Sequence, residues 1–276
     1  MLMMSLPPPT SGREWIVAIG CIIAASLVNQ LVAPNQKLII GGSHDEEMSY
    51  PLMPQQVPEG LLLGIAGVLP LIAVCVLGEM TAEPGQGRRD MHVNALMLVQ
   101  SIGAAVLVTT VAKKQAGRPR PCFYAMCQWQ NTTEPAGCTA KTHTEWEARQ
   151  SFPSGHSSFS FAGLLFLSLL LIDKFKVMGK KRKLPLSIPA AAWQLVACIP
   201  AFIAMWISIT RVVDYWHNYD DILAGSVIGG LSATLAFNQR ARYNQTWFSE
   251  RIGVGPPPSD TIGLSSNGDD DASNEV

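Results

Sequence analysis

Six long apolar stretches constrain the fold of this chain more than any other feature of its sequence. A membrane-spanning helix needs about 20 mostly apolar residues, and six stretches come close to that length: about 15–33, 59–80, 91–112, 157–173, 188–209 and 221–238. Only 15% of the 276 residues are charged, against about a quarter in an ordinary soluble domain. The sequence therefore predicts an all-α, polytopic membrane protein whose six transmembrane helices form a helical bundle.

Basic residues orient the six predicted spans. An even number of spans places both termini on one side, and short cytoplasmic loops carry an excess of Lys and Arg. The densest basic cluster, 174–183 (KFKVMGKKRK), follows the fourth span, and further arginines follow the second and sixth spans at Arg88, Arg89, Arg240 and Arg242. We therefore expect both termini to be cytoplasmic, in a membrane that the sequence does not specify.

A single membrane domain is predicted between two tails. We expect residues 1–13 to be a disordered cytoplasmic N-terminus, 14–240 to form the membrane domain, and 241–276 to form a cytoplasmic, largely disordered tail. Pro, Gly, Ser and acidic residues dominate about 252–276, and such a composition offers too little apolar surface to fold.

The longest connection between spans, about 113–156, falls on the non-cytoplasmic side. It contains Cys122, Cys127 and Cys138 and a glycosylation sequon at Asn131. Outside the cytoplasm both a disulfide and an N-glycan can form. We expect one disulfide among the three cysteines, without assigning which two form it. We also expect the protein to be a glycoprotein.

Cations follow the third span in the segment 113–121 (KKQAGRPRP). Lys113 offers a flexible ammonium, and Arg120 offers a planar guanidinium that can bind two phosphate oxygens at once. Prolines on both sides of Arg120 stiffen the chain there. The pattern indicates phosphate binding, with a basic flank of a membrane span as the alternative; Arg118 is a further candidate or a solvated side chain.

The sequence Pro153-Ser154-Gly155-His156 stands immediately before the fourth span. A Ser–Gly turn at a helix N-terminus exposes backbone N–H groups, and the helix dipole there favours an anion. Ser154 and Gly155 are therefore candidates to bind a phosphate beside the imidazole of His156. A plain helix cap with an interfacial histidine is the alternative.

The segment from Arg211 to Asp221 (RVVDYWHNYDD) joins the fifth and sixth spans. His217 and Asp221 are four residues apart, one helical turn, so the carboxylate can lie against the ring of the histidine. Such a contact fixes the tautomer and leaves the other ring nitrogen free to attack. A structural His–Asp pair is the alternative, and Asp214 and Asp220 are expected to be structural or solvated.

All three segments are predicted to reach the non-cytoplasmic membrane boundary, because each adjoins that end of a span. Together, Lys113-x6-Arg120-Pro121, the PSGH sequence and Arg211-x5-His217-x3-Asp221 resemble the three-part signature of the type 2 phosphatidic acid phosphatase superfamily. The flanking sequence resembles its eukaryotic lipid phosphate phosphatase branch, and the match covers about 113–225.

Two positions depart from the pattern of that branch. Thr210 stands where Ser is usual, and Asn218 stands where a second His often follows the first. Neither departure removes a group that the resemblance implies to be catalytic, although Asn218 bears on substrate preference or pH response.

The resemblance implies a phosphohistidine mechanism. His217 would attack phosphorus, Asp221 would orient it, and His156 would protonate the leaving alcohol and then assist water. The phosphate oxygens would be stabilised by three cations and a helix N-terminus: Lys113, Arg120, Arg211, Ser154 and Gly155. We therefore expect no metal or other cofactor, and a rate that rises and falls with pH because two histidines take part.

The function expected from these residues is hydrolysis of phosphatidate-type phosphate monoesters to diacylglycerol and phosphate, with lysophosphatidate and diacylglycerol pyrophosphate as further substrates. Sphingoid-base phosphates, isoprenyl (di)phosphates and soluble phosphate esters stay open within the same superfamily. The rival functions are a vanadate-dependent haloperoxidase, a non-catalytic membrane interaction protein of this fold and a transporter. We expect a membrane lipid as partner and no nucleic acid, and the oligomeric state stays open.

Overall fold

The computed structural model describes residues 11–37, 39, 46–81, 86–130, 137–180 and 189–252. Six helical stretches in this part of the chain are long and apolar enough to cross a membrane: Gly12–Leu31, Glu59–Met80, Gly87–Ala116, Gly155–Lys176, Ala191–Val213 and Tyr219–Tyr243. They match the six predicted spans, so the prediction of a polytopic helical membrane protein is confirmed. The N-terminal tail up to residue 10, the sequon Asn131 and the tail from residue 253 lie outside the described residues.

Four of the spans are single helices, and two contain a π-helical turn. The single helices are α1 (Ser11–Leu31), α4 (Gly87–Ala116), α9 (Ala190–Val213) and α10 (Tyr219–Ile252). The second span consists of α2 (Glu59–Leu63), η3 (Gly64–Val68) and α3 (Leu69–Thr81), and the fourth consists of α7 (Gly155–Ser160), η4 (Phe161–Leu165) and α8 (Phe166–Lys180). Helix α10 continues to Ile252, beyond the domain limit expected at residue 240.

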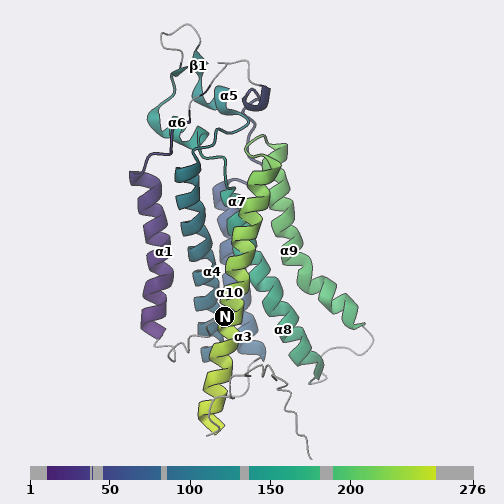
Figure 1. The fold of residues 1–276 in the computed structure, drawn as a ribbon. Helices are drawn as coiled ribbons and strands as arrows, with labels where there is room; N and C mark the ends of the chain where they lie inside the picture. The colour runs from purple at the N-terminus through teal and green to yellow at the C-terminus, as the bar shows by residue number, and fades with distance from the viewer. Residues whose placement is uncertain are drawn as a thin grey trace, which may run out of the picture.

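Helix α4 lies inside the bundle, where it contacts α1, α3 and α10 (Figure 1). Its Met97 is fully buried in a core that also contains Phe166 and Leu170 of α8. Helix α10 approaches the start of α7 so closely at Gly225 and Gly229 that a Cβ atom there would clash with the backbone oxygens of Ser154 and Ser158. Such small residues allow helices to pack backbone to backbone in a membrane, and this contact sets the depth of the PSGH turn against the start of α10.

A small cap covers one end of the bundle (Figure 1). It is formed by the short elements between α4 and α7: α5 (Phe123–Cys127), β1 (Trp129–Gln130), β2 (Gly137–Cys138) and α6 (Thr142–Ala148). The two strands pair antiparallel. A disulfide joins Cys127 to Cys138 with 5.1 Å between the Cα atoms, while Cys122 is buried and free. The structure thus forms the single disulfide that was expected and identifies its partners.

The ends of α4 and α9 and the starts of α7 and α10 lie at the cap end of the bundle (Figure 1). These four helix ends carry most of the predicted site residues, and Arg120, Ser154 and His217 lie in the adjoining connections. The side of the membrane that the cap faces stays a prediction from the basic residues. The cap elements lie in the chain between the 113–121 segment and the PSGH turn.

Candidate active site

A cavity of about 310 Å³ lies where these helix ends meet. Its lining includes most of the predicted site residues: Lys113, Arg120, Gly155, His156, Arg211 and His217. Ser154 and Asp221 are completely buried and are absent from this lining. The structure therefore brings the three separated segments together around one hollow.

Lys113 lies in the last turn of α4, and the end of that helix determines the direction of the chain after it. Gly117 ends α4 in the left-handed conformation, with φ 54°, which glycine adopts without steric cost. A side chain at this position would clash with the backbone oxygen of Asn35. The Lys113 ammonium donates to the carbonyl of Gln150, so two of its three N–H donors remain for a ligand in the cavity.

Arg120 is held by the cap and is almost fully buried. Its Nε donates to the carbonyl of Glu147 over 2.9 Å, and its Nη2 forms an ion pair with the Glu147 carboxylate. The guanidinium lies 4.8 Å from the centre of the Trp216 ring, and Nη1 lies 3.4 Å from Nε2 of His217. Arg120 is thus fixed with one edge toward the histidine.

Glu147 is a site residue that the sequence analysis missed. Burial disfavours its carboxylate, but the charges of Arg120 and Lys113 outweigh burial and lower the pKa of Glu147. It precedes the PSGH turn on α6, where nothing in the neighbouring sequence indicates an arginine as its partner. The contact exists only because the cap folds back over α4.

Arg211 is anchored from the connection that precedes α2. Its Nη1 donates to the side-chain oxygen of Gln55 over 2.9 Å, and its Nη2 pairs with Asp214 over 2.7 Å. Asp214 in turn accepts from the backbone and side-chain nitrogens of Gln56, at 2.9 and 2.7 Å. Asp214 is therefore structural, one of the two outcomes expected for it, and the two glutamines carried no signal in the sequence.

His156 lies in the first turn of α7, which Ser154 caps. The Ser154 hydroxyl accepts from the backbone N–H of Ser157 over 3.4 Å, as a helix N-cap does. Nε2 of His156 lies 2.9 Å from the carbonyl of Val57. Because a carbonyl can only accept, Nε2 carries a proton, and Nδ1 is the ring nitrogen that can gain or lose one.

His217 lies in a tight turn between α9 and α10. The backbone N–H groups of Trp216 and His217 both donate to the carbonyl of Arg211, over 3.0 and 3.2 Å, and Tyr215 adopts a left-handed φ of 59° that reverses the chain. Helix α10 begins only at Tyr219. The prediction that His217 and Asp221 share a helical turn was therefore wrong, because the tight turn replaces the first part of that helix.

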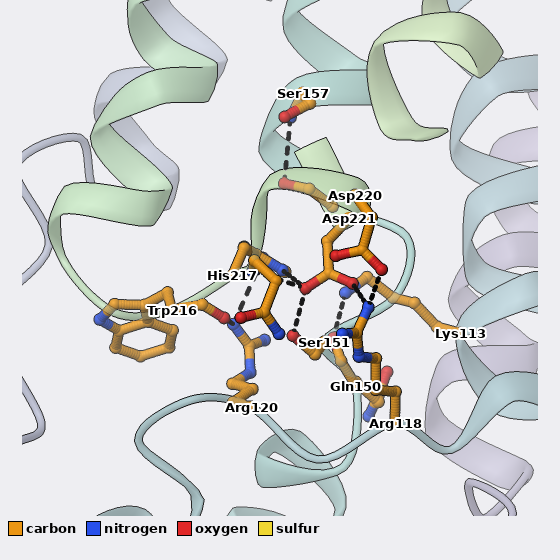
Figure 2. Close-up of polar contacts among 12 residues, drawn as sticks. Lys113, Arg118, Arg120, Gln150, Ser151, Ser157, Trp216, His217, Asp220 and Asp221 are labelled. Carbon is orange, nitrogen blue, oxygen red and sulfur yellow. Dashed lines mark hydrogen bonds and ion pairs between the residues drawn. The ribbon is translucent and has the colours of Figure 1, made fainter. Parts of the chain in front are cut away.

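Asp221 nevertheless lies beside His217, because it caps α10 from within. Its Oδ2 accepts from the backbone N–H of Asn218 over 2.8 Å and from the Ser151 hydroxyl over 2.6 Å, and its Oδ1 accepts from Arg118 over 2.8 Å (Figure 2). Nδ1 of His217 is 3.6 Å from the same Oδ2, which is longer than a hydrogen bond. The carboxylate is oriented by three donors and acts on His217 through its charge.

Arg118 and Ser151 complete this arrangement. Arg118, which the sequence left as a candidate or a solvated cation, pairs with Asp221 and with the exposed Asp220 (Figure 2). Ser151 stands just before the PSGH sequence and was not selected. Both residues act on the carboxylate behind the histidine, and neither lines the cavity.

The surroundings of His217 keep its ring neutral. Burial lowers the pKa of His217 well below its ordinary value of 6.5, and the charges of Arg120 and Lys113 lower it further, while Asp221 opposes them. The ring therefore offers a nitrogen lone pair at neutral pH. Nδ1 is on the side of the carboxylate, so Nε2, next to Arg120, is the nitrogen available for attack.

An apolar hollow of about 590 Å³ adjoins the polar cavity. It is lined by apolar side chains of α2, α3 and α4, including Leu62, Leu71 and Leu98, and it shares Lys113 and His156 with the polar cavity. The two hollows together fit a ligand with an anionic head and an apolar tail. Among the described residues, no group of three His, Cys, Asp or Glu side chains is arranged to hold a metal ion.

The fold and the site define a helical membrane protein with a cavity lined by cationic side chains at one end of its bundle. The sequence profile of the PAP2 superfamily matches residues 94–245. Lipid phosphate phosphatase 2 of Arabidopsis thaliana is 30% identical over 233 residues, which cover 82% of this chain and 76% of that protein. The chain therefore belongs to the PAP2 superfamily, as its three-part signature indicated.

Other relatives carry related names. A probable diacylglycerol pyrophosphate phosphatase 1 of Schizosaccharomyces pombe is 31% identical over 206 residues, covering 71% of this chain and 69% of that protein. A putative phosphatidate phosphatase of Drosophila melanogaster is 29% identical over 232 residues, covering 70% of this chain and 59% of that protein. These relatives support membership of the lipid phosphate phosphatase branch. No solved structure matches the chain.

Proposed function

We propose that this protein is a lipid phosphate phosphatase that hydrolyses phosphatidate-type monoesters through a phosphohistidine intermediate, without a metal. The observation that carries the proposal is the position of His217, whose Nε2 lies 3.4 Å from Arg120 in a cavity also lined by Lys113, His156 and Arg211. The names of the relatives support a lipid phosphate as the substrate.

The phosphate of the substrate binds among the cations. Lys113 at the end of α4, Arg120 in the connection after it and Arg211 at the end of α9 supply N–H donors, and Gly155 adds the N-terminal end of α7. Two carboxylates and a glutamine hold both arginines in place, so little reorganisation is needed as charge develops on the phosphoryl oxygens. In this proposal, the fixed cations provide the charge stabilisation that magnesium provides in other phosphoryl-transfer enzymes.

In the first step, the Nε2 lone pair of His217 forms a bond to phosphorus while the phosphorus–oxygen ester bond breaks. The bonding electrons leave with the alcohol oxygen, and His156 donates a proton to it. Asp221 stabilises the positive charge that the ring of His217 acquires. The products of this step are diacylglycerol and a phosphohistidine.

In the second step, water attacks the phosphohistidine while His156 accepts a proton from it. The nitrogen–phosphorus bond breaks, its electrons return to His217, and phosphate leaves. We assign Ser154 to this mechanism as the cap of α7, because its hydroxyl accepts from Ser157 and its N–H donates to the carbonyl of Asp221. Ser154 thus links the two histidine-bearing segments.

We also propose that the cavity faces the lumen or the exterior, with both termini in the cytoplasm. The basic residues after the second, fourth and sixth spans support this orientation. The disulfide between Cys127 and Cys138 agrees with a cap in an oxidising compartment.

The test is phosphate release from phosphatidate in detergent micelles with excess EDTA, using the His217→Ala protein as the blank. We expect the full rate with EDTA present, and an acid-labile phosphoryl label on the wild-type protein after rapid quenching of labelled substrate. Loss of activity that added Mg²⁺ restores would contradict the metal-independent mechanism. Release of no phosphate from any lipid phosphate would favour a non-catalytic protein of this fold.

A further inference from the structure

Glu59 holds a position that the proposed mechanism does not use. It is the first residue of α2, and it lines both the polar cavity and the apolar hollow. Its side chain is exposed, and in the described part of the chain no side chain or backbone group forms a hydrogen bond or ion pair with its carboxylate. Within the described residues, Glu59 thus presents an unpaired carboxylate on the wall of both hollows.

The shared lining places Glu59 beside the phosphate-bearing end of a bound lipid. Lys113, Gly155 and His156 also line both hollows, so the boundary between the hollows lies next to the residues that bind the phosphate. A substrate with its phosphate in the polar cavity and its tail in the apolar hollow must cross this boundary. The atoms that cross it are the first carbons after the ester oxygen.

A carboxylate at this boundary discriminates among such carbons. It accepts hydrogen bonds but donates none, and it forms its strongest ones with a cationic donor. Diacyl phosphatidate has both glycerol hydroxyls esterified and presents no donor there. A single-chain phosphate monoester with a free amine or hydroxyl close to the phosphate presents one.

We propose that Glu59 forms a head-group subsite that selects phosphate monoesters carrying an ammonium or hydroxyl donor near the ester carbon. This proposal rests on the phosphatase function proposed above and refines its substrate class. Sphingoid-base phosphates supply the ammonium and lysophosphatidate supplies the hydroxyl. The structural alternative is that Glu59 only complements the positive end of the α2 dipole, in which case all substrates respond alike to its replacement.

The experiment compares kcat/KM for a sphingoid-base phosphate, lysophosphatidate and phosphatidate in micelles, using wild type, Glu59→Gln and Glu59→Asp. We expect Glu59→Gln to lower kcat/KM about tenfold or more for the ammonium substrate and less for the hydroxyl substrate, since a lost hydrogen bond to a charged group weighs more than a neutral one. For phosphatidate, kcat/KM of Glu59→Gln should differ by less than about twofold from that of the wild type. Glu59→Asp should retain part of the preference for the ammonium substrate over phosphatidate. The matched control is Glu46→Gln, at an exposed glutamate of η2 (Glu46–Met48) that lines neither hollow.

Equal losses for all three substrates, or no loss for any, would overturn the subsite. If kcat/KM of Glu59→Gln falls only for the sphingoid-base phosphate, Glu59 recognises the ammonium. If it falls for both single-chain substrates, Glu59 recognises either an ammonium or a hydroxyl. A second measurement needs no variant: acetylating the amine of the sphingoid-base phosphate should lower kcat/KM of the wild type, and an unchanged value contradicts the proposal. If the wild type releases phosphate from phosphatidate but the substrate ratios do not move, only the subsite fails; if it releases none from any substrate, the phosphatase proposal itself fails.

Discussion

Buried cations form ion pairs at both ends of this bundle, but only those at the cap end line either of the two hollows described above. Away from the cap, Arg240 of α10 pairs with Asp173 of α8 over 3.1 Å and donates to Asn94 of α4 over 2.6 Å. Lys174 of α8 lies 3.4 Å from Asp90 of α4. These contacts tie three helices together, and neither cavity described above is lined by any of these residues.

At the cap end the pairs use the same chemistry. Arg120 pairs with Glu147 and Arg211 with Asp214, and further polar contacts hold Arg120, Arg211 and Asp214. There, however, the arginines also line a cavity that contains two histidines. The comparison teaches that an ion pair with a carboxylate explains how a buried cation is tolerated. A binding site requires in addition a cavity into which N–H donors without a protein partner point.

The largest effect that tests this comparison is on the histidines. His217→Ala should lower the rate by about 10⁴-fold or more, since loss of a nucleophile leaves only binding and charge stabilisation. The matched change is His92→Ala, at a ring that contacts Trp15 on α1 and lies away from the cavity. Phosphate release measured with both proteins at equal amounts of folded protein should separate them, and ordinary activity in His217→Ala would refute its role as nucleophile.

The next largest effect is expected from replacing Asp221, the carboxylate beside His217. Asp221 raises the pKa of His217 against burial, which lowers it, so Asp221→Asn should lower that pKa further. The nucleophile must be neutral, and the acid limb of kcat/KM therefore lies below pH 6.5 in the wild type and should move to lower pH in the variant. The rate itself should fall about 10²-fold to 10⁴-fold, because the charged ring loses its counter-ion.

The control for this pH profile is Asp220→Asn. Asp220 also pairs with Arg118, but it is largely exposed and is not among the groups that most strongly shift the pKa of His217. The acid limb of kcat/KM for the Asp220→Asn protein should coincide with that of the wild type. An acid limb that moves to higher pH in Asp221→Asn would show that the carboxylate does not stabilise the charged ring.

The smallest effects are expected when one arginine at each end of the bundle is replaced by lysine. Arg120→Lys removes the planar guanidinium that faces His217 and should lower kcat/KM about 10²-fold. Arg240→Lys removes part of a structural contact and should lower the unfolding temperature while leaving kcat/KM within about twofold. Kinetics and thermal unfolding on both variants check this, and a large loss of activity in Arg240→Lys would break the comparison.

Much of this structure was accessible from local sequence. Apolar length is a property of each segment by itself, so the six spans agreed with the structure in number and position. Charged groups at the ends of spans are equally local, and for that reason the 113–121, PSGH and 211–221 segments were identified. Arg240 shows the limit of this reasoning: it was read as a marker of a cytoplasmic loop, yet it is buried inside α10 and paired.

Contacts between distant segments could not be derived in this way. Gln55 reaches Arg211, the carbonyl of Val57 accepts from His156, and Glu147 holds Arg120. None of these partners has a spacing or a neighbouring residue that indicates its role. Each contact depends on how the cap and the start of α2 pack over the helix ends.

The sequence by itself determined the class of protein, the positions of the spans and the three segments that carry the site residues, because hydropathy and charge are properties of a few neighbouring residues. Only the tertiary structure decided which side chains face the cavity and which stand behind it. Asp221 and Ser154 are buried behind the reactive groups, and His217 is presented by a turn where its spacing had indicated a helix. The physical reason is that the orientation of a buried polar side chain depends on hydrogen bonds to partners far away in the chain, and these exist only once the helices have packed.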